Sequence, residues 1–290
     1  MLWPEISMQD LQELEIVFEA KNHINCLNTK NYAGFIFFDI GSVLLDLDWD
    51  AYIYEVQKLL PENAIKDHQK TLKILKKEAV LKQWCTGKMG AYNYAQSFIK
   101  ALTESAALEH KIPNISIHDI KRADTFVVGG VRLSVVELAK KLREKNFGIG
   151  VLSNATTWHE VLIEKKLPVR DIFDVTIFSQ DIGYEKPEPQ IYELAFLEAQ
   201  KFISKKFNAT LDVKDVYFID DTPVNVRAAY KVGWNASLVN LLSDEILFKV
   251  SSNKMSDQEL KDVSCKRENL IFGYNASQRV EKIFGNIIKI

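Results

Sequence analysis

Short apolar runs that end at polar residues are the most regular feature of this chain. Runs at 35–39, 149–153, 175–179, 216–220 and 236–239 have the length of strands. Uninterrupted apolar runs are typical of strands that are covered on both faces, because neither face of such a strand is polar. The pattern therefore predicts a sheet that is buried between two other layers.

Helical spacing of the apolar residues separates these runs. Predicted helices over 135–145, 190–206 and 223–232 alternate with the predicted strands, and a capping box at Thr157–Glu160 opens another helix. Alternating strands and helices favour a doubly wound parallel sheet. We therefore expect an α/β fold with a three-layer, Rossmann-like parallel sheet core, in which ligands bind at the carboxyl ends of the strands.

A long helical region interrupts this alternation after the first predicted strand. Apolar residues at helical spacing extend over 51–123, which predicts an α-helical cap inserted into the core. Similar patterns over 8–21 and 280–287 predict helical extensions on both sides of the core. The expected organisation is an N-terminal extension at 1–32, a core formed by 33–49 and 124–240, a cap at 50–123 and a C-terminal extension at 241–290.

Composition and charge narrow the class of protein. The 290 residues are 47% hydrophobic and 26% charged, as in ordinary globular proteins, and the net charge of -2 gives no sign of a nucleic-acid partner. Cysteines 26, 85 and 265 lie far apart, which favours a reducing compartment. The sequence has no segment with the features of a signal peptide or a membrane span. We therefore expect a cytoplasmic protein.

Chemically active side chains follow four of the predicted strands. In chain order they are Asp39, Ser153, Asn154, Lys186, Asp220 and Asp221. Because the carboxyl ends of parallel strands meet at one edge of a sheet, these side chains are expected to converge there. Each is a weak signal alone: a strand-end aspartate is often a turn former, and Asp221 could instead cap the helix that follows it.

These residues lie in four segments that together resemble the motifs of the haloacid dehalogenase (HAD) superfamily. The segments are FFDIGSVL (37–44), VLSNAT (151–156), GYEKPEPQIY (183–192) and FIDDTPVNVRAA (218–229). The resemblance covers roughly residues 33–240, and the spacing suits a helical, C1-type cap inserted after the first motif. The stretch DIGSVLLDLD (39–48) is similar to the sugar-1-phosphatase-like members.

The resemblance implies a Mg²⁺-dependent phosphatase. Asp39 would be the nucleophile and would form an aspartyl-phosphate, which divides one hard displacement into two easier steps. Mg²⁺ prefers oxygen ligands, and these would be Asp39, Asp220 and the backbone carbonyl of Gly41, with Asp221 acting directly or through water.

The remaining motif residues would bind the phosphoryl group. Ser153 and the backbone N–H of Asn154 would hold its oxygens, and Lys186 would supply positive charge in the transition state. The side-chain amide of Asn225 would orient Asp221 or Lys186. The resemblance thus assigns catalysis to Asp39, Ser153 and Lys186.

One position departs from the family pattern. Gly41 stands where the family's phosphatases carry a second aspartate, which protonates the leaving oxygen and then activates water. Such acid–base catalysis typically contributes about 10² to 10⁴ in rate. Three interpretations remain open. The protein could prefer aryl phosphates such as phosphotyrosine or sugar phosphates, the missing acid could be replaced by Asp46, Asp48 or a residue of the cap, or activity could be lost in a domain that only binds.

The resemblance also leaves the substrate open. A haloacid-type dehalogenase would use the same nucleophile on carbon without a metal, whereas the intact Asp220-Asp221 pair favours phosphate chemistry. A small-molecule phosphate ester or a phosphoprotein is therefore the expected substrate. In the predicted cap, Trp84, Tyr92 and Tyr94 are candidates for lining the cleft, although packing between cap helices would also explain them.

Overall fold

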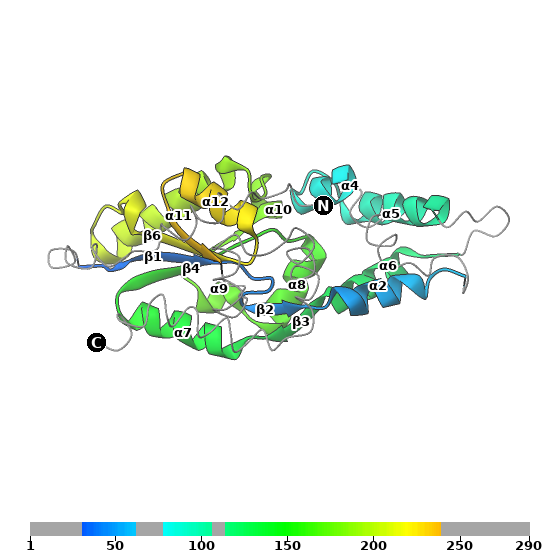
Figure 1. Cartoon of the computed structure of the whole chain (residues 1–290), viewed down its shortest axis with the longest axis horizontal. Coiled ribbons are helices and arrows are strands. Elements are labelled where there is room, and N and C mark those ends of the chain that lie inside the picture. Colours follow the sequence, from blue (N-terminus) through cyan, green and yellow to red (C-terminus); the bar gives the residue numbers. More distant parts are fainter. Residues whose placement is uncertain (1–30, 62–77, 106–113, 239–290) are drawn as a thin grey trace, which may run out of the picture.

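A five-stranded parallel sheet forms the centre of the molecule. The structure is a computed structural model that describes residues 31–61, 78–105 and 114–238. The strand order is β5-β4-β1-β6-β7, and every neighbouring pair runs parallel (Figure 1). The strands are β1 Gly34–Phe38, β4 Phe147–Ser153, β5 Val175–Phe178, β6 Val216–Asp220 and β7 Asn235–Leu238. The predicted parallel α/β sheet is confirmed.

Helices cover both faces of this sheet and make a three-layer core. Phe35 and Phe37 of β1 pack in one buried cluster, whereas Ile36 and Phe38 pack in another on the opposite face. One face is covered by α7 Leu133–Glu144, α8 Thr157–Lys166 and α9 Val169–Ile172, and the other by α11 Pro189–Phe207 and α12 Pro223–Lys231. Figure 1 shows α11 and α12 on one side of the sheet and α7 on the other. The short helix α10 Ser179–Ile182 follows β5.

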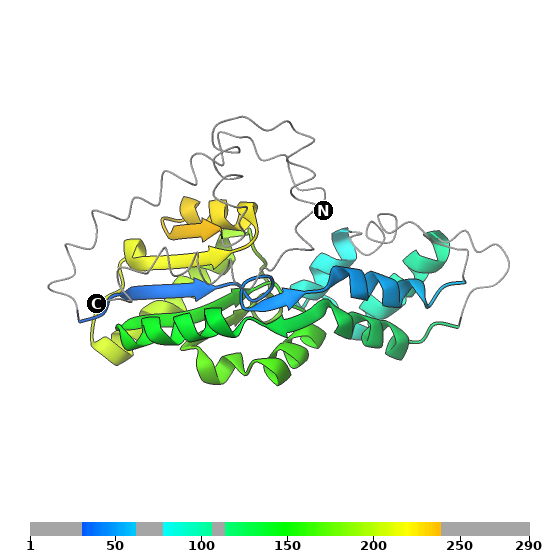
Figure 2. The same ribbon diagram turned by 60° about the horizontal axis from the view of Figure 1, so that its bottom comes forward.

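A group of helices extends beyond the carboxyl edge of the sheet (Figure 2). We call it the helical insertion; it consists of α2 Trp49–Gln57, α4 Glu78–Cys85, α5 Ala91–Ser105 and α6 Ile117–Asp124. Its connection to the core includes the antiparallel strands β2 Leu45–Leu47 and β3 Val128–Val131, with the 3₁₀-helix η3 Thr125–Val127 before β3. These two strands were not predicted, because they are too short to show a period in the sequence. The helical pattern at 51–123 is confirmed within the described residues.

Smaller differences concern helix ends and the chain termini. The side chain that caps α8 is that of Thr156, which accepts a hydrogen bond from the backbone N–H of His159, so the capping box predicted at Thr157 is wrong by one residue. The helices predicted at 8–21 and 280–287 lie outside the described residues.

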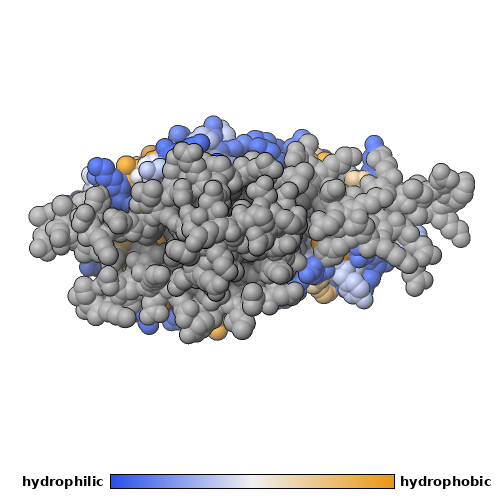
Figure 3. Space-filling model, viewed as in Figure 1, coloured by the Kyte–Doolittle hydropathy of each residue, from blue (hydrophilic) through white to orange (hydrophobic). Residues whose placement is uncertain are grey.

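Where the described residues are visible in Figure 3, along the edges of the view, they are mostly hydrophilic with some apolar residues between them. Within the described ranges, none of the helices combines the length and apolar content that crossing a membrane requires.

Candidate active site

Asp39 lies at the centre of the carboxyl edge of the sheet. It directly follows β1, the middle strand, and its backbone N–H donates to the carbonyl of Ile219 in β6 at 2.8 Å. Its Oδ1 accepts a hydrogen bond of 2.7 Å from the backbone N–H of Ile40. Only 8% of the residue is exposed, so the carboxylate is largely shielded from water.

Lys186 joins Asp39 to Asp220. Its Nζ lies 2.9 Å from Oδ1 of Asp39 and 2.7 Å from Oδ2 of Asp220. Burial by itself would lower the pKa of the Lys186 ammonium, but the carboxylates of Asp220 and Asp39 outweigh it and raise the pKa. The lysine therefore stays charged inside the protein and compensates two carboxylates.

Asp220 is the most enclosed acid of the site. Its Oδ1 accepts from the backbone N–H of Thr222 at 2.7 Å, and the side-chain amide of Asn225 donates to both of its oxygens at 3.2 and 3.1 Å. Complete burial raises the pKa of Asp220, and Lys186 opposes that rise. Asn225 thus orients Asp220, whereas the sequence interpretation assigned it to Asp221 or Lys186.

Asp221 completes an acidic cluster with Asp39 and Asp220. One carboxylate oxygen from each residue lies within 4.8 Å of those of the other two. Asp221 is not the cap of the next helix: the N-cap of α12 is Thr222, whose hydroxyl donates to Oδ1 of Asp221 at 3.0 Å. Three converging carboxylate oxygens are a donor set that suits a hard divalent cation such as Mg²⁺.

The loop after β4 lies beside this cluster. Ser153 ends β4, is 4% exposed, and belongs to the strand that pairs with β1. The side chain of Asn154 binds the backbone of Lys186 twice, donating from Nδ2 to its carbonyl and accepting at Oδ1 from its N–H, each at 2.8 Å. This second function of Asn154 was not predicted, since the two residues are 32 positions apart in the chain.

The aromatic candidates of the insertion lie elsewhere. Trp84 is 1% exposed and stacks on Tyr94 with ring centroids 3.7 Å apart, while Trp158 of α8 meets Trp84 edge-on at 4.7 Å. We call Trp84, Tyr94 and Trp158 the aromatic cluster. Tyr92, by contrast, is 64% exposed. The structure therefore places Trp84 in packing between insertion and core, which is the alternative that the sequence left open, and leaves Tyr92 on the surface.

Neither acid near Gly41 is free to replace the missing general acid. Asp46 forms an ion pair of 2.7 Å with the buried Arg132, and Asp48 caps α2 by accepting from the N–H of Ala51 at 2.8 Å. A Cβ atom on Gly41 would lie 2.9 Å from Cδ1 of Leu47. Leu47 thus fills the space that a side chain at position 41 would need.

His159 of α8 lies against an acid of the insertion. Its Nε2 lies 3.0 Å from Oδ2 of Asp124 at the end of α6, with 20% of the histidine side chain and 4% of the aspartate side chain exposed. The pair therefore links the core to the insertion, and no local sequence signal marks it.

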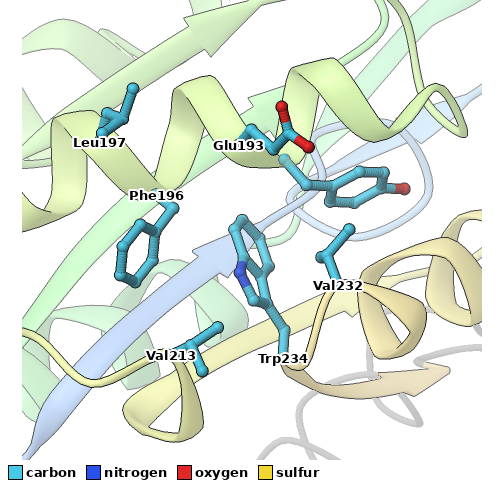
Figure 4. Close-up of a pocket in the computed structure, with 7 residues that line it drawn as sticks. Glu193, Phe196, Leu197, Val213, Val232 and Trp234 are labelled. Atoms are coloured by element: carbon cyan, nitrogen blue, oxygen red, sulfur yellow. The ribbon is translucent and has the colours of Figure 1, made fainter.

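A separate apolar pocket of about 240 Å³ lies between α11 and the end of α12. Figure 4 shows Phe196 and Leu197 on one side and Val213, Val232 and Trp234 on the other. Tyr192 also lines it and donates from its hydroxyl to the backbone carbonyl of Asn225 at 2.9 Å. The lining is apolar apart from Tyr192 and Glu193, and it contains none of the three carboxylates of the acidic cluster, so this pocket is distinct from that cluster.

Comparisons with known proteins identify the family of this chain. Residues 35–233 match the family model described as haloacid dehalogenase-like hydrolase. The chain is 28% identical over 195 residues to Phosphate metabolism protein 8 of Saccharomyces cerevisiae, covering 58% of each protein. It is also 28% identical over 151 residues to the Rhythmically expressed gene 2 protein of Drosophila melanogaster, covering 50% of this chain and 55% of that protein. The chain thus spans about half the length of the curated relatives it matches.

Among solved structures, the chain is similar to a HAD family enzyme of Bacteroides thetaiotaomicron in complex with magnesium and inorganic phosphate. The TM-score is 0.56 and the identity 21%, and the match covers 71% of this chain and 93% of that one. At this level of identity the likeness shows the fold.

Proposed function

Because this chain belongs to the haloacid dehalogenase-like hydrolase family, we propose that it is a Mg²⁺-dependent phosphomonoester hydrolase that works through an aspartyl-phosphate on Asp39. The observation that carries the proposal is the position of Lys186, whose Nζ contacts both Asp39 and Asp220 beside a third carboxylate. A buried ammonium stabilises the negatively charged oxygens around it, here those of two carboxylates. It can do the same for the oxygens of a transferring phosphoryl group.

Asp39 would attack phosphorus with a carboxylate oxygen while the bond to the leaving oxygen breaks. The N–H of Ile40 holds Oδ1 of Asp39, which leaves Oδ2 for the attack. Water would then hydrolyse the aspartyl-phosphate, release inorganic phosphate and restore the carboxylate. Ser153 and the N–H of Asn154 would bind phosphoryl oxygens in both steps.

Asp39, Asp220 and Asp221 would hold Mg²⁺, with the carbonyl of Gly41 as a further ligand. When bound, the ion supplies charge compensation between the carboxylate and the phosphate. Asn225 and the N–H of Thr222 would keep Asp220 oriented as a ligand.

The identity of residue 41 supports a restricted choice of ester. With Leu47 against Gly41, and with Asp46 and Asp48 engaged elsewhere, leaving groups that need little protonation are favoured. We therefore propose aryl phosphates, including phosphotyrosine, or sugar phosphates as substrates, in line with the sugar-1-phosphatase-like members. Two alternatives, a binding domain without activity and a metal-free dehalogenase, are tested by the same assay.

We also propose the domain division given by the sequence, with residues 50–123 as a C1-type cap on a core of 33–49 and 124–240. A cytoplasmic location is proposed from the widely spaced cysteines.

The deciding experiment measures phosphate release from an aryl phosphate with Mg²⁺ and with a chelator, for the unmodified protein and for Asp39→Asn. We expect Mg²⁺-dependent turnover that Asp39→Asn abolishes. Turnover that is absent, or equal in the two proteins, would refute the proposal. Halide release from a 2-haloacid without metal would instead identify a dehalogenase.

A further inference from the structure

The end of helix α4 touches the loop that carries Lys186. Nζ of Lys82 lies 2.9 Å from Oε1 of Glu188 and 3.7 Å from Oε1 of Glu185. These two glutamates flank Lys186 in the chain, and the N–H of Glu185 donates to Oε2 of Glu188 at 2.9 Å. The insertion thus binds the Lys186 loop through one charged side chain.

The same end of α4 also reaches the loop that follows Ser153. The hydroxyl of Ser179 donates to the backbone carbonyl of Cys85, the last residue of α4, and accepts from the N–H of Ala155 at 3.2 Å. Ser179 is completely buried, so this hydroxyl is a fixed bridge between the insertion and the residue next to Asn154.

The turn after α4 lies tightly against the core. Gly87 has a φ of +65°, and a Cβ atom there would lie 2.4 Å from the carbonyl oxygen of Gln180 in α10. A backbone approach this close admits no side chain, and the left-handed φ also favours glycine. The sequence therefore provides for direct contact between this turn and the core.

These contacts close a ring. Lys82 of α4 contacts the 185–188 loop, and the amide of Asn154 binds both backbone groups of Lys186 in that loop. The next residue, Ala155, donates to Ser179, which in turn donates to Cys85 at the end of α4. We propose that the end of α4 is a positioning element: seating the insertion on the core sets Lys186 and the Ser153–Asn154 loop relative to each other. This inference rests on the proposed function, in which both loops bind the phosphoryl group.

Ser179 and Lys82 are then positioning residues rather than catalytic ones. Ser179 is expected to matter more, because it is buried, whereas half of the Lys82 side chain is exposed and exposed ion pairs are weak. Their effect should fall on kcat, since they align groups that act in the transition state, with KM changed by less than about twofold.

The test compares Ser179→Ala, Lys82→Gln and Lys82→Arg in the full chain. Lys140→Gln is the matched control, because Lys140 forms an exposed ion pair of 2.8 Å with Glu137 on α7. Steady-state turnover of an aryl phosphate with Mg²⁺ gives kcat and KM, and hydrogen exchange reports the backbone of residues 154–156 and 184–188.

We expect Ser179→Ala to lower kcat about tenfold and Lys82→Gln about two- to threefold, with Lys82→Arg near the unmodified value. Both damaging variants should speed exchange in the two loops but not in β6, and Lys140→Gln should change neither quantity. Unchanged loop exchange, an effect on KM alone, or faster exchange throughout the sheet would overturn the inference. If the unmodified protein releases no phosphate, the proposed function fails, while the exchange comparison still decides whether α4 orders these loops.

Discussion

The carboxyl edge of the sheet and the interface between the insertion and the core are both buried. The first consists of charged side chains and the second of aromatic ones. At the sheet edge, Lys186 forms ion pairs with Asp39 and Asp220, and hydrogen bonds from neighbouring N–H and amide groups hold both carboxylates. At the interface, Trp84, Tyr94 and Trp158 pack ring against ring. Buried ion pairs seldom stabilise a fold more than apolar residues of similar volume would, whereas buried aromatic rings contribute large apolar areas.

This contrast indicates that the two regions serve different ends. We expect the ionic site to serve the proposed reaction while adding little to stability, and the aromatic cluster to hold the insertion on the core. Substitutions should therefore separate loss of activity from loss of stability, except where a substitution leaves a buried charge without a partner.

Lys186→Met should produce the largest effect and should affect both properties. Removing the ammonium leaves Asp39 and Asp220 unpaired, which typically costs about 3–5 kcal/mol of unfolding free energy. Turnover should fall by at least about 10²- to 10³-fold, because charge stabilisation at the phosphoryl group is lost. Denaturant unfolding and aryl phosphate turnover measure the two effects.

Lys140→Met is the control for this substitution, since its ion pair is exposed, and it should change stability by less than about 0.5 kcal/mol. Adding Mg²⁺ should restore part of the stability of Lys186→Met, because the cation replaces the missing charge. If Lys186→Met keeps full activity, Lys186 serves only the fold. The charged and the aromatic regions would then not differ in their function.

Trp84→Ala should act on stability first. Trp84 is fully packed between Tyr94 and Trp158, and truncation of a buried tryptophan typically costs about 3–5 kcal/mol. Tyr92→Ala is the matched control one helix away, since its side chain is exposed, and it should cost less than about 0.5 kcal/mol. Thermal or denaturant unfolding compares the two. If Trp84→Ala leaves stability unchanged and alters only KM, the aromatic cluster is a substrate site instead of packing.

The two regions also differ in how far the sequence could predict them. Asp39, Lys186 and Asp220 could be located because each follows an apolar run, and parallel strands bring such positions to one edge. The pairs Asn154–Lys186 and Asp124–His159 could not, because they join distant segments through side chains with no periodic pattern. Trp84 was ambiguous for a physical reason: helical spacing shows that a face is buried, but not whether ligand or protein covers it.

The Asp124–His159 pair gives the aromatic interface a pH dependence. Burial by itself would lower the pKa of His159, but the nearby Asp124 carboxylate outweighs it and raises the pKa above its ordinary value. Such a group contributes stability that is present below the unfolded-state pKa of about 6.5 and is lost as the pH rises through the folded-state value. We therefore expect the pair to stabilise the fold at low pH and to lose this contribution at high pH.

Denaturant unfolding measures this contribution by comparing the unmodified protein with His159→Gln. The comparison covers pH 5 to 9, a range of about four units around the histidine value. Tyr52, Tyr94 and Cys85 also face Asp124, but burial raises all three pKa values, that of Cys85 to about 12, so they stay neutral. The difference in unfolding free energy between the unmodified protein and His159→Gln should shrink as the pH rises. Asp124→Asn should show the same pH dependence as His159→Gln. Parallel pH profiles would contradict an ionic pair.

The smallest predicted effect lies at Gly41, two residues after Asp39. Its φ is outside the left-handed range, so the backbone accepts a side chain and only Leu47 obstructs it. Combining Gly41→Asp with Leu47→Ala should therefore admit a general acid beside Asp39 and raise turnover of an alkyl phosphate about tenfold, with little change for an aryl phosphate. Leu47→Ala alone is the control and should not alter the ratio of the two rates. If both esters slow equally in the double variant, the acid at position 41 cannot reach the leaving oxygen, and the preference for good leaving groups must come from the helical insertion.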